Sequence, residues 1–188
     1  MKATGIVRRI DDLGRVVIPK EIRRTMRIRE GDPLEIYTDR EGEVIFKKYS
    51  PIGELAAFAG QYAETLHKTC GLSVAICDRD AVIACSGISK KEYNDKPLSD
   101  RLEQIIENRS LYNYQSGGEM IPLISDAGDT PAHYISCAMP ILSEGDIVGC
   151  VVALRDSAGS SQDSALGNDV ETKLIQTAAG FLGRQLES

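Results

Sequence analysis

Basic side chains are concentrated in the first 29 residues of this 188-residue chain. That segment holds nine lysines and arginines against three acidic residues, a formal charge of +6, whereas the whole chain carries −6. The guanidinium group of arginine presents a planar fork of N–H donors that matches phosphate oxygens, and each neutralised phosphate releases counterions. The charge asymmetry therefore predicts that this segment binds a nucleic acid. The alternative is an ordinary solvated face.

The spacing of the cations favours the first interpretation. Four of them recur at i, i+3, i+4 and i+7, the spacing of one helix face: Lys20, Arg23, Arg24 and Arg27. Pro19 suits the first position of such a helix, which we expect to run to about Ile28, before the breaker that begins at Gly31. Like charges at these spacings destabilise a helix, and Glu21 is the one acid among them. Binding of phosphate groups to these side chains would offset the repulsion between their charges.

Residues 1–48 read as short strands and turns around this helix. The expected elements are a strand at 3–10, a turn at 11–14, a strand at 15–18, and a hairpin of strands 33–38 and 44–48 across 39–42. So small a unit buries too little surface to be stable alone, and it has no cysteine before Cys70 and no histidine before His67. We therefore expect an obligate dimer.

A second domain follows a short connection at residues 49–55. Ser50 is suited to cap a helix that starts at Pro51 and ends at Gly71. The elements expected over residues 52–188 are an amphipathic helix from 52, strands at 72–77 and 81–85, a helix at 98–108, a loop with one edge strand at 110–130, a hairpin of 133–139 with 146–154, and a last helix from 168. Asn168 and Glu171 predict a capping box for that helix. This order predicts an α+β domain, an antiparallel sheet with flanking helices.

The stretch GRVVIPKEIRRTMRIREGDPLEI, preceded by ATGIVRRIDD, resembles the AbrB-like swapped-hairpin DNA-binding family. The resemblance implies that two chains exchange hairpins into one interleaved β-rich dimer. It also implies DNA contacts by the arginines at matching positions: Arg8, Arg15, Arg23 and Arg24. The charge pattern alone adds further candidate DNA-binding residues: Lys2, Arg9, Lys20 and Arg27.

The segment from residue 50 onward resembles a GAF-type domain, and the tandem resembles sporulation regulators of endospore-forming bacteria. That resemblance implies an activator or repressor of sporulation genes in the forespore, and we expect it to be cytoplasmic and nucleoid-associated. Two amphipathic helices, at 52–66 and 170–186, predict that the second domain joins dimers into a tetramer. This domain is also a candidate sensor of a small molecule. The alternatives are an antitoxin-type or an architectural DNA-binding protein whose second domain only oligomerises.

The expected partner is double-stranded DNA, read mainly through its shape, with A·T-rich flexible sites favoured. No Asn or Gln stands beside the basic stripe to read adenine. A membrane partner is not expected, because the longest apolar run, residues 147–154, is far shorter than the roughly 20 residues of a span. The amino-terminal residues do not form a secretory signal.

The sequence predicts no enzyme, metal site or cofactor. Two histidines, His67 and His133, give no nucleophilic triad and no zinc-ligand spacing. For the cysteines, parity places Cys77 and Cys85 on opposite faces of their hairpin, and Cys137 and Cys150 on one face as diagonal neighbours. A small-molecule pocket is expected near three tyrosines in or beside the irregular segment: Tyr112, Tyr114 and Tyr134.

Overall fold

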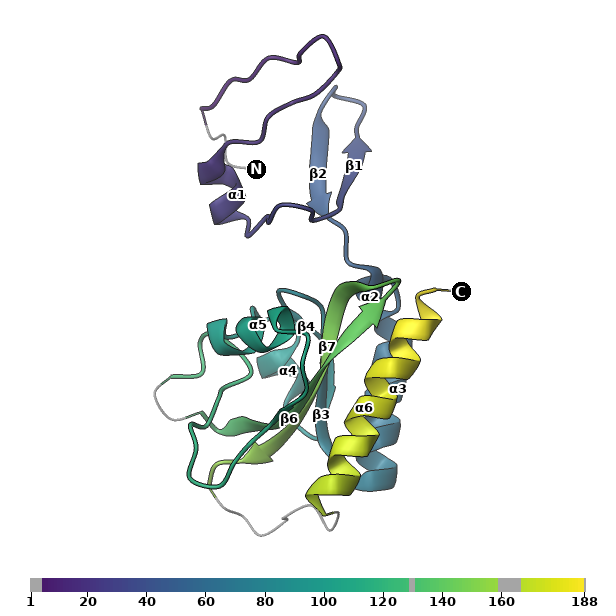
Figure 1. Cartoon of the computed structure of the whole chain (residues 1–188). Coiled ribbons are helices and arrows are strands. Elements are labelled where there is room, and N and C mark those ends of the chain that lie inside the picture. The colour runs from purple at the N-terminus through teal and green to yellow at the C-terminus, as the bar shows by residue number, and fades with distance from the viewer. Residues whose placement is uncertain (1–4, 129–130, 159–166, 188) are drawn as a thin grey trace. The chain divides into compact units, whose positions relative to one another are not determined.

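The computed structural model of the chain describes residues 5–128, 131–158 and 167–187. The chain divides into two compact units, Met1–Tyr49 and Ser50–Ser188 (Figure 1). Each unit has its own sheet, of two strands in the first and five in the second. The candidate Lys2 lies outside the described residues.

The first unit contains one short helix and one hairpin. Helix α1 spans Lys20–Thr25, and strands β1 (Leu34–Thr38) and β2 (Val44–Lys48) pair antiparallel. The hairpin predicted across 39–42 is confirmed, and the Asp39 carboxylate accepts the N–H groups of Glu41 and Glu43, each at 2.9 Å, to close its turn. The helix is shorter than predicted, since it begins after Pro19 and ends six residues later.

The two strands expected at 3–10 and 15–18 are wrong for the single chain. No strand forms over the described residues 5–18, although the predicted turn is present, with the Gly14 N–H donating to the Asp11 carbonyl at 3.0 Å. A strand requires a neighbouring strand to take up its N–H and C=O groups, and a single chain offers this segment none among the residues described. Residues 5–18 therefore have the apolar pattern of strands but do not join a sheet in the single chain.

The second unit is an antiparallel sheet between two layers of helices, as the sequence predicts. Its sheet has the order β4-β3-β7-β6-β5. In chain order the elements are α2 (Pro51–Glu54), α3 (Ala56–Cys70), β3 (Ser73–Cys77), β4 (Val82–Ser86), α4 (Lys90–Tyr93), α5 (Asp100–Glu107), β5 (Tyr112–Asn113), β6 (His133–Ser143), β7 (Asp146–Asp156) and α6 (Asn168–Gln185). The helix start at Ser50 is confirmed, because its hydroxyl accepts the Gly53 N–H at 3.1 Å. The end at Gly71, in the left-handed conformation, is also confirmed, but the single helix predicted between them is wrong, because Leu55 divides it into α2 and α3.

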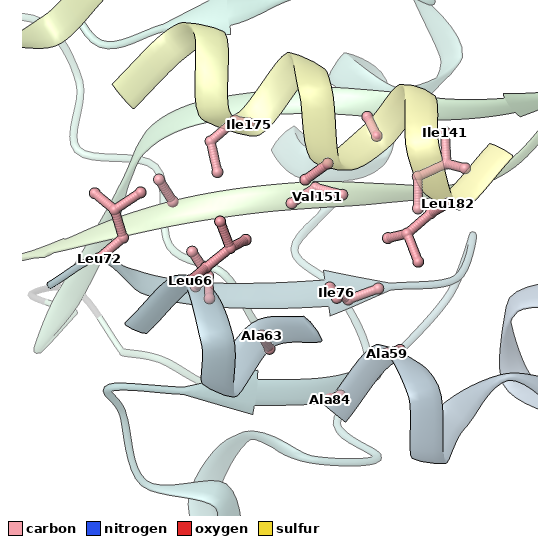
Figure 2. Close-up of a cluster of buried hydrophobic side chains, with 14 of the residues drawn as sticks. Ala59, Ala63, Leu66, Leu72, Ile76, Ala84, Ile141, Val151, Ile175 and Leu182 are labelled. Carbon is pink, nitrogen blue, oxygen red and sulfur yellow. The ribbon is translucent and has the colours of Figure 1, made fainter. Parts of the chain in front are cut away.

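Helices α3 and α6 lie side by side over one face of the sheet (Figure 1). Figure 2 shows Leu66 of α3 and Ile175 and Leu182 of α6 directed at Ile76 and Val151 of the central strands. Helix α6 approaches the β6–β7 hairpin especially closely at Gly183, where a Cβ atom would collide with the Leu142 carbonyl oxygen. Glycine is required there by packing.

The opposite face of the sheet is covered by α5 and the segment that follows it. Leu98, Leu102 and Ile106 are almost completely buried there, together with Leu123 and Ile135. Helix α5 begins two residues after the predicted start at Leu98, and the hydroxyl of Ser99 accepts the Leu102 N–H as its cap. This face is filled by aliphatic side chains of the chain itself.

Two β-bulges reverse the predicted faces of the cysteines. In β3–β4 the pair Cys77↔Val82 is as expected, but a register shift next to Cys77 pairs Cys85 with Ala75, so both thiols lie in the α5-side cluster. In β6–β7 a shift beside Leu142 places Cys150 opposite Pro140. One extra residue moves every later side chain to the other face. Cys137 therefore lies on the α3/α6 side and Cys150 on the α5 side, and the predicted pairing of these two cysteines is wrong.

The buried thiols are expected to be chemically inert in the folded protein. Burial raises the pKa of Cys77, Cys85 and Cys150, and burial together with the nearby Glu171 carboxylate raises the pKa of Cys137 to about 12. Because the thiolate is the nucleophile, iodoacetamide at pH 8 should label the native protein at Cys70 at most, which is half-buried. Peptide mass spectrometry before and after unfolding checks this. Labelling of Cys137 in the native protein would contradict it.

Candidate nucleic-acid interface

Helix α1 displays its cations to solvent. Lys20, Arg23 and Arg24 are exposed, and the helix has no buried residue, so its six positions contribute little to any core within one chain. The hydroxyl of Thr25 donates to the Glu21 carbonyl at 2.9 Å within the same helix. The structure therefore brings three of the predicted DNA-binding side chains together on one short, solvent-facing element.

Arg27 is not part of the helical stripe, which corrects the predicted i+7 position. The helix ends at Thr25, and Arg27 has a positive φ of 52°. Its side chain therefore leaves the backbone in a direction that the 3.6-residue period does not describe. Arg27 remains exposed and is the residue after the C-cap Met26, so it still lies at the carboxyl-terminal end of α1.

Arg15 is held by the turn that precedes α1. The carboxylate of Asp11 accepts the backbone N–H of Arg15 at 2.8 Å and the Arg15 Nε–H at 2.7 Å. The hydrogen bond from the Arg15 backbone N–H is the larger cause of a lowered pKa of Asp11, and the bond from the Arg15 side chain lowers it further. Both side chains are solvent-exposed, so the pair orients the guanidinium group rather than adding much stability. Arg8 and Arg9 are exposed on the strand-like segment just upstream.

The first unit also exposes a large apolar surface. Val7 is 89% exposed and Val17 is 71% exposed, and other apolar side chains of the unit are exposed with them: Ile6, Ile10, Leu13, Val16, Met26, Ile36, Tyr37 and Val44. Monomeric proteins rarely present so much contiguous apolar surface, and such surfaces mark interfaces. These residues come from the segment that lacks strands, from the C-cap of α1 at Met26 and from the hairpin.

The three candidate tyrosines of the second unit do not form one cluster. The rings of Tyr114 and Tyr134 are in contact, with centroids 4.8 Å apart. Tyr112 instead packs against the α5-side core, and burial raises its pKa. Tyr114 lines a polar pocket of about 250 Å³ with residues of β5 and the loop after it, of β6 and β7, and of the start of α6: Asn113, Gln115, Ser116, Ser136, Arg155, Asn168, Asp169, Glu171 and Thr172.

A buried ionic network forms the floor of this pocket, and sequence reasoning missed it. Glu171, 3% exposed, accepts a hydrogen bond from the Ser136 hydroxyl and one from Arg155 Nη2 at 2.7 Å. Ser136 is the extra residue of the β6 bulge. The capping box predicted for α6 is therefore wrong: Gly167 is the N-cap, and Asn168 accepts from Arg155 instead. The signal that could have located Glu171 is its position one turn into an otherwise apolar stripe.

The two histidines and the acidic side chains form no metal site among the residues that the structure describes. No group of three or more His, Cys, Asp and Glu side chains could hold a metal ion within that part of the chain. His67 contacts the Leu72 carbonyl through Nδ1, and His133 contacts the Tyr93 hydroxyl. Among the same residues, every helix is too short or too polar to cross a bilayer.

Comparison with known proteins gives matches to both units. Residues 54–187 match the family described as stage V sporulation protein T C-terminal, transcription factor, and residues 7–53 match the family described as antidote-toxin recognition MazE, bacterial antitoxin. The stage V sporulation protein T of Bacillus subtilis is 54% identical over 187 residues, which are 100% of this chain and 99% of that protein.

Two further similarities each concern one unit. The transition state regulatory protein AbrB of Bacillus subtilis is 65% identical over 51 residues, which are 27% of this chain and 52% of that protein. The solved cofactor-binding GAF domain of the nutrient sensor CodY from Clostridium difficile is 18% identical, with a TM-score of 0.45, over 68% of this chain and 83% of that one.

Proposed function

This chain belongs to the stage V sporulation protein T family of transcription factors, and from that premise we propose that it controls sporulation genes by binding A·T-rich duplex DNA through residues 1–48. The observation that carries the proposal is the solvent-facing cation set of α1, with Arg15 oriented just before it. Residues 52–188 then form the sensing and oligomerising domain, joined through residues 49–55. The site of action is the nucleoid in the cytoplasm, in the forespore.

The proposed DNA preference follows from the absence of Asn and Gln side chains beside the cations of α1. Arginines on phosphates fix register without reading sequence, so discrimination comes from DNA shape and deformability. Titrating the full chain against labelled duplexes of equal length, one A·T-rich and one G·C-rich, should give tighter binding to the first. Equal affinities would favour the alternative of an architectural protein, and no binding at low salt would refute the proposed DNA-binding function.

We propose that the first unit is an obligate dimer formed by exchange of hairpins. The support is the exposed apolar surface described above, which includes Val7 and Val17 on the segment without strands. A partner chain would supply both the strand neighbours and the apolar cover that one chain does not. Two copies would also double the cations of α1, which suits a duplex with its two phosphate backbones.

An aromatic cluster with one exposed member on the helical face of the second unit supports a tetramer. Phe181 is 41% exposed on α6, and its ring lies 6.0 Å from Phe58 and 5.5 Å from Tyr62 of α3, centroid to centroid. Helices α3 and α6 cover the sheet with their other faces, so this aromatic patch is available to a second copy.

The Phe181→Glu variant should therefore sediment as a dimer where the unmodified chain sediments as a tetramer, because a carboxylate at a buried contact costs several kcal/mol. Gln176→Glu, which places the same charge on another exposed position of α6, is the matched control and should remain tetrameric. Sedimentation velocity at micromolar concentration measures both. A tetramer for both variants would place the interface elsewhere.

Small-molecule sensing is a second proposed function, and the pocket beside Tyr114 is the observation that favours it. A cleft with hydroxyl, amide and charged side chains above a buried ionic network suits a small polar ligand. Mass spectrometry of small molecules that co-purify with the full chain should find a species retained by the natural sequence and lost from Tyr114→Ala. Identical profiles would leave the second unit an oligomerisation module.

A further inference from the structure

The carboxyl-terminal end of the basic helix has an unusual cap. The Ile28 N–H donates to the Arg23 carbonyl at 2.7 Å and the Arg27 N–H to the Arg24 carbonyl at 3.2 Å, which is the Schellman pattern. The residue after the C-cap in this pattern adopts the left-handed conformation and is usually glycine. Here it is Arg27, with φ of 52°. A residue with a Cβ atom costs about 1 kcal/mol or more in that conformation, so neighbouring contacts must hold it.

Lys48 supplies such a contact from 21 residues away. Its Nζ donates to the Arg27 carbonyl oxygen at 2.8 Å and forms an ion pair with Asp32 Oδ2 at 3.3 Å. The same carboxylate oxygen accepts the Arg29 N–H at 2.8 Å. The side chain of Lys48 is 23% exposed and that of Asp32 is 4% exposed, so this ion pair is much less screened than a surface pair. The ammonium group lies at the negative end of the α1 dipole.

We propose that Lys48 is a positioning residue of the DNA-binding surface: it fastens the end of α1 to strand β2 and so fixes the directions of Arg23, Arg24 and Arg27. The inference rests on the DNA-binding function proposed above. A helix of six residues is marginal by itself. The Lys48 contacts restrict the end of α1 and the left-handed residue Arg27 before DNA binds. Less conformational entropy is then lost on binding, which is the general advantage of a preorganised site.

A direct phosphate contact by Lys48 is the competing explanation, and the two make different predictions. The contacts to Arg27 and Asp32 direct the ammonium group into the protein. A phosphate contact would lower the slope of log affinity against log salt by about 1 per lysine removed. Replacing a positioning residue would instead lower the affinity and leave the slope of log affinity against log salt unchanged.

The test compares Lys48→Met with Lys47→Met in the full chain. Lys47 occupies the neighbouring strand position, is exposed, and has its Nζ 4.6 Å from the centre of the Tyr37 ring, so its replacement removes one charge without touching the clamp. Lys48→Met should bind duplex DNA at least about 10-fold more weakly than Lys47→Met, with the same salt slope, and Lys48→Arg should recover most of the loss. Equal affinities of the two methionine variants, or a lower slope for Lys48→Met alone, would overturn the inference.

Asp32→Asn keeps the inference testable should Lys48→Met fold poorly. This change removes a negative charge, so simple electrostatics predicts tighter binding to a polyanion. Loss of the clamp predicts weaker binding at an unchanged circular dichroism spectrum. Tighter binding by Asp32→Asn would contradict the positioning role. Failure of the unmodified chain to bind any duplex would instead refute the proposed function, so the two failures are distinguishable.

Discussion

The double variant Arg23→Ala/Arg24→Ala is expected to bind duplex DNA at least about 100-fold more weakly than the unmodified chain. A dimer loses four guanidinium groups, and a net contribution of about 1 kcal/mol from each charge-assisted hydrogen bond suffices for that loss. Neither side chain is buried, and α1 has no buried residue, so the fold should be unchanged. Fluorescence anisotropy measures the affinity, and circular dichroism verifies the fold.

Lys90→Ala/Lys91→Ala provides the control for net charge. These two lysines are exposed on α4 of the second unit, and their removal changes the charge of the chain by the same amount. The control variant should keep its DNA affinity to within a few-fold. If it weakened binding as much as the arginine variant, overall charge rather than the surface of α1 would be responsible.

The variant Val17→Asp is expected to abolish both dimerisation through the first unit and DNA binding. Val17 is 71% exposed in the single chain, on the segment that carries the pattern of a strand without forming one. A partner that covers this segment would bury two carboxylates per dimer, each costing at least about 3 kcal/mol. Analytical ultracentrifugation and anisotropy on the same samples measure the two effects.

Val17→Ile keeps the apolar character of this position and should behave as the unmodified chain in both measurements. The second unit should retain its fold in either variant, because the described residues of its two core clusters all belong to that unit. A Val17→Asp variant that still formed the same assembly and bound DNA would show that this segment lies outside the dimer interface. The hairpin-exchange proposal would then be abandoned.

Local signals predicted those elements whose determinants lie within a few residues. The turn residues Asp39–Gly42 define the β1–β2 hairpin, Ser50 caps the following helix, and Gly71 ends the next one in the left-handed conformation. Each depends on a hydrogen bond or a backbone angle that the residue itself supplies. Sequence reasoning therefore located these boundaries to within a residue or two.

The errors arose where contacts between distant positions decide the outcome. The strand expected at 15–18 has no neighbouring strand among the described residues, and we propose that a second chain supplies it. The register shift beside Leu142 reverses side-chain parity between the turn of the β6–β7 hairpin and Cys150, so the faces of Cys137 and Cys150 were misjudged. Glu171 was assigned to a cap because the local pattern fits one, whereas Arg155 of β7 draws it into the core.

The same distinction applies to the candidate DNA-binding residues. Residue type and spacing identified the cations of α1, because charge and exposure are local properties. The left-handed backbone of Arg27, its carbonyl bond to Lys48 and the partly buried Asp32 join positions far apart in sequence. Periodicity alone could not show them.

The salt dependence of DNA affinity tests the central claim most directly, namely that the arginines of the first unit neutralise phosphates. If the four family-matched arginines of each protomer contact phosphates, log affinity should fall with log salt at a slope of about −7 for a dimer. Arg23→Ala/Arg24→Ala should reduce the steepness by about 4, to roughly half. Affinity that is insensitive to salt, or an unchanged slope in the double variant, would contradict the account.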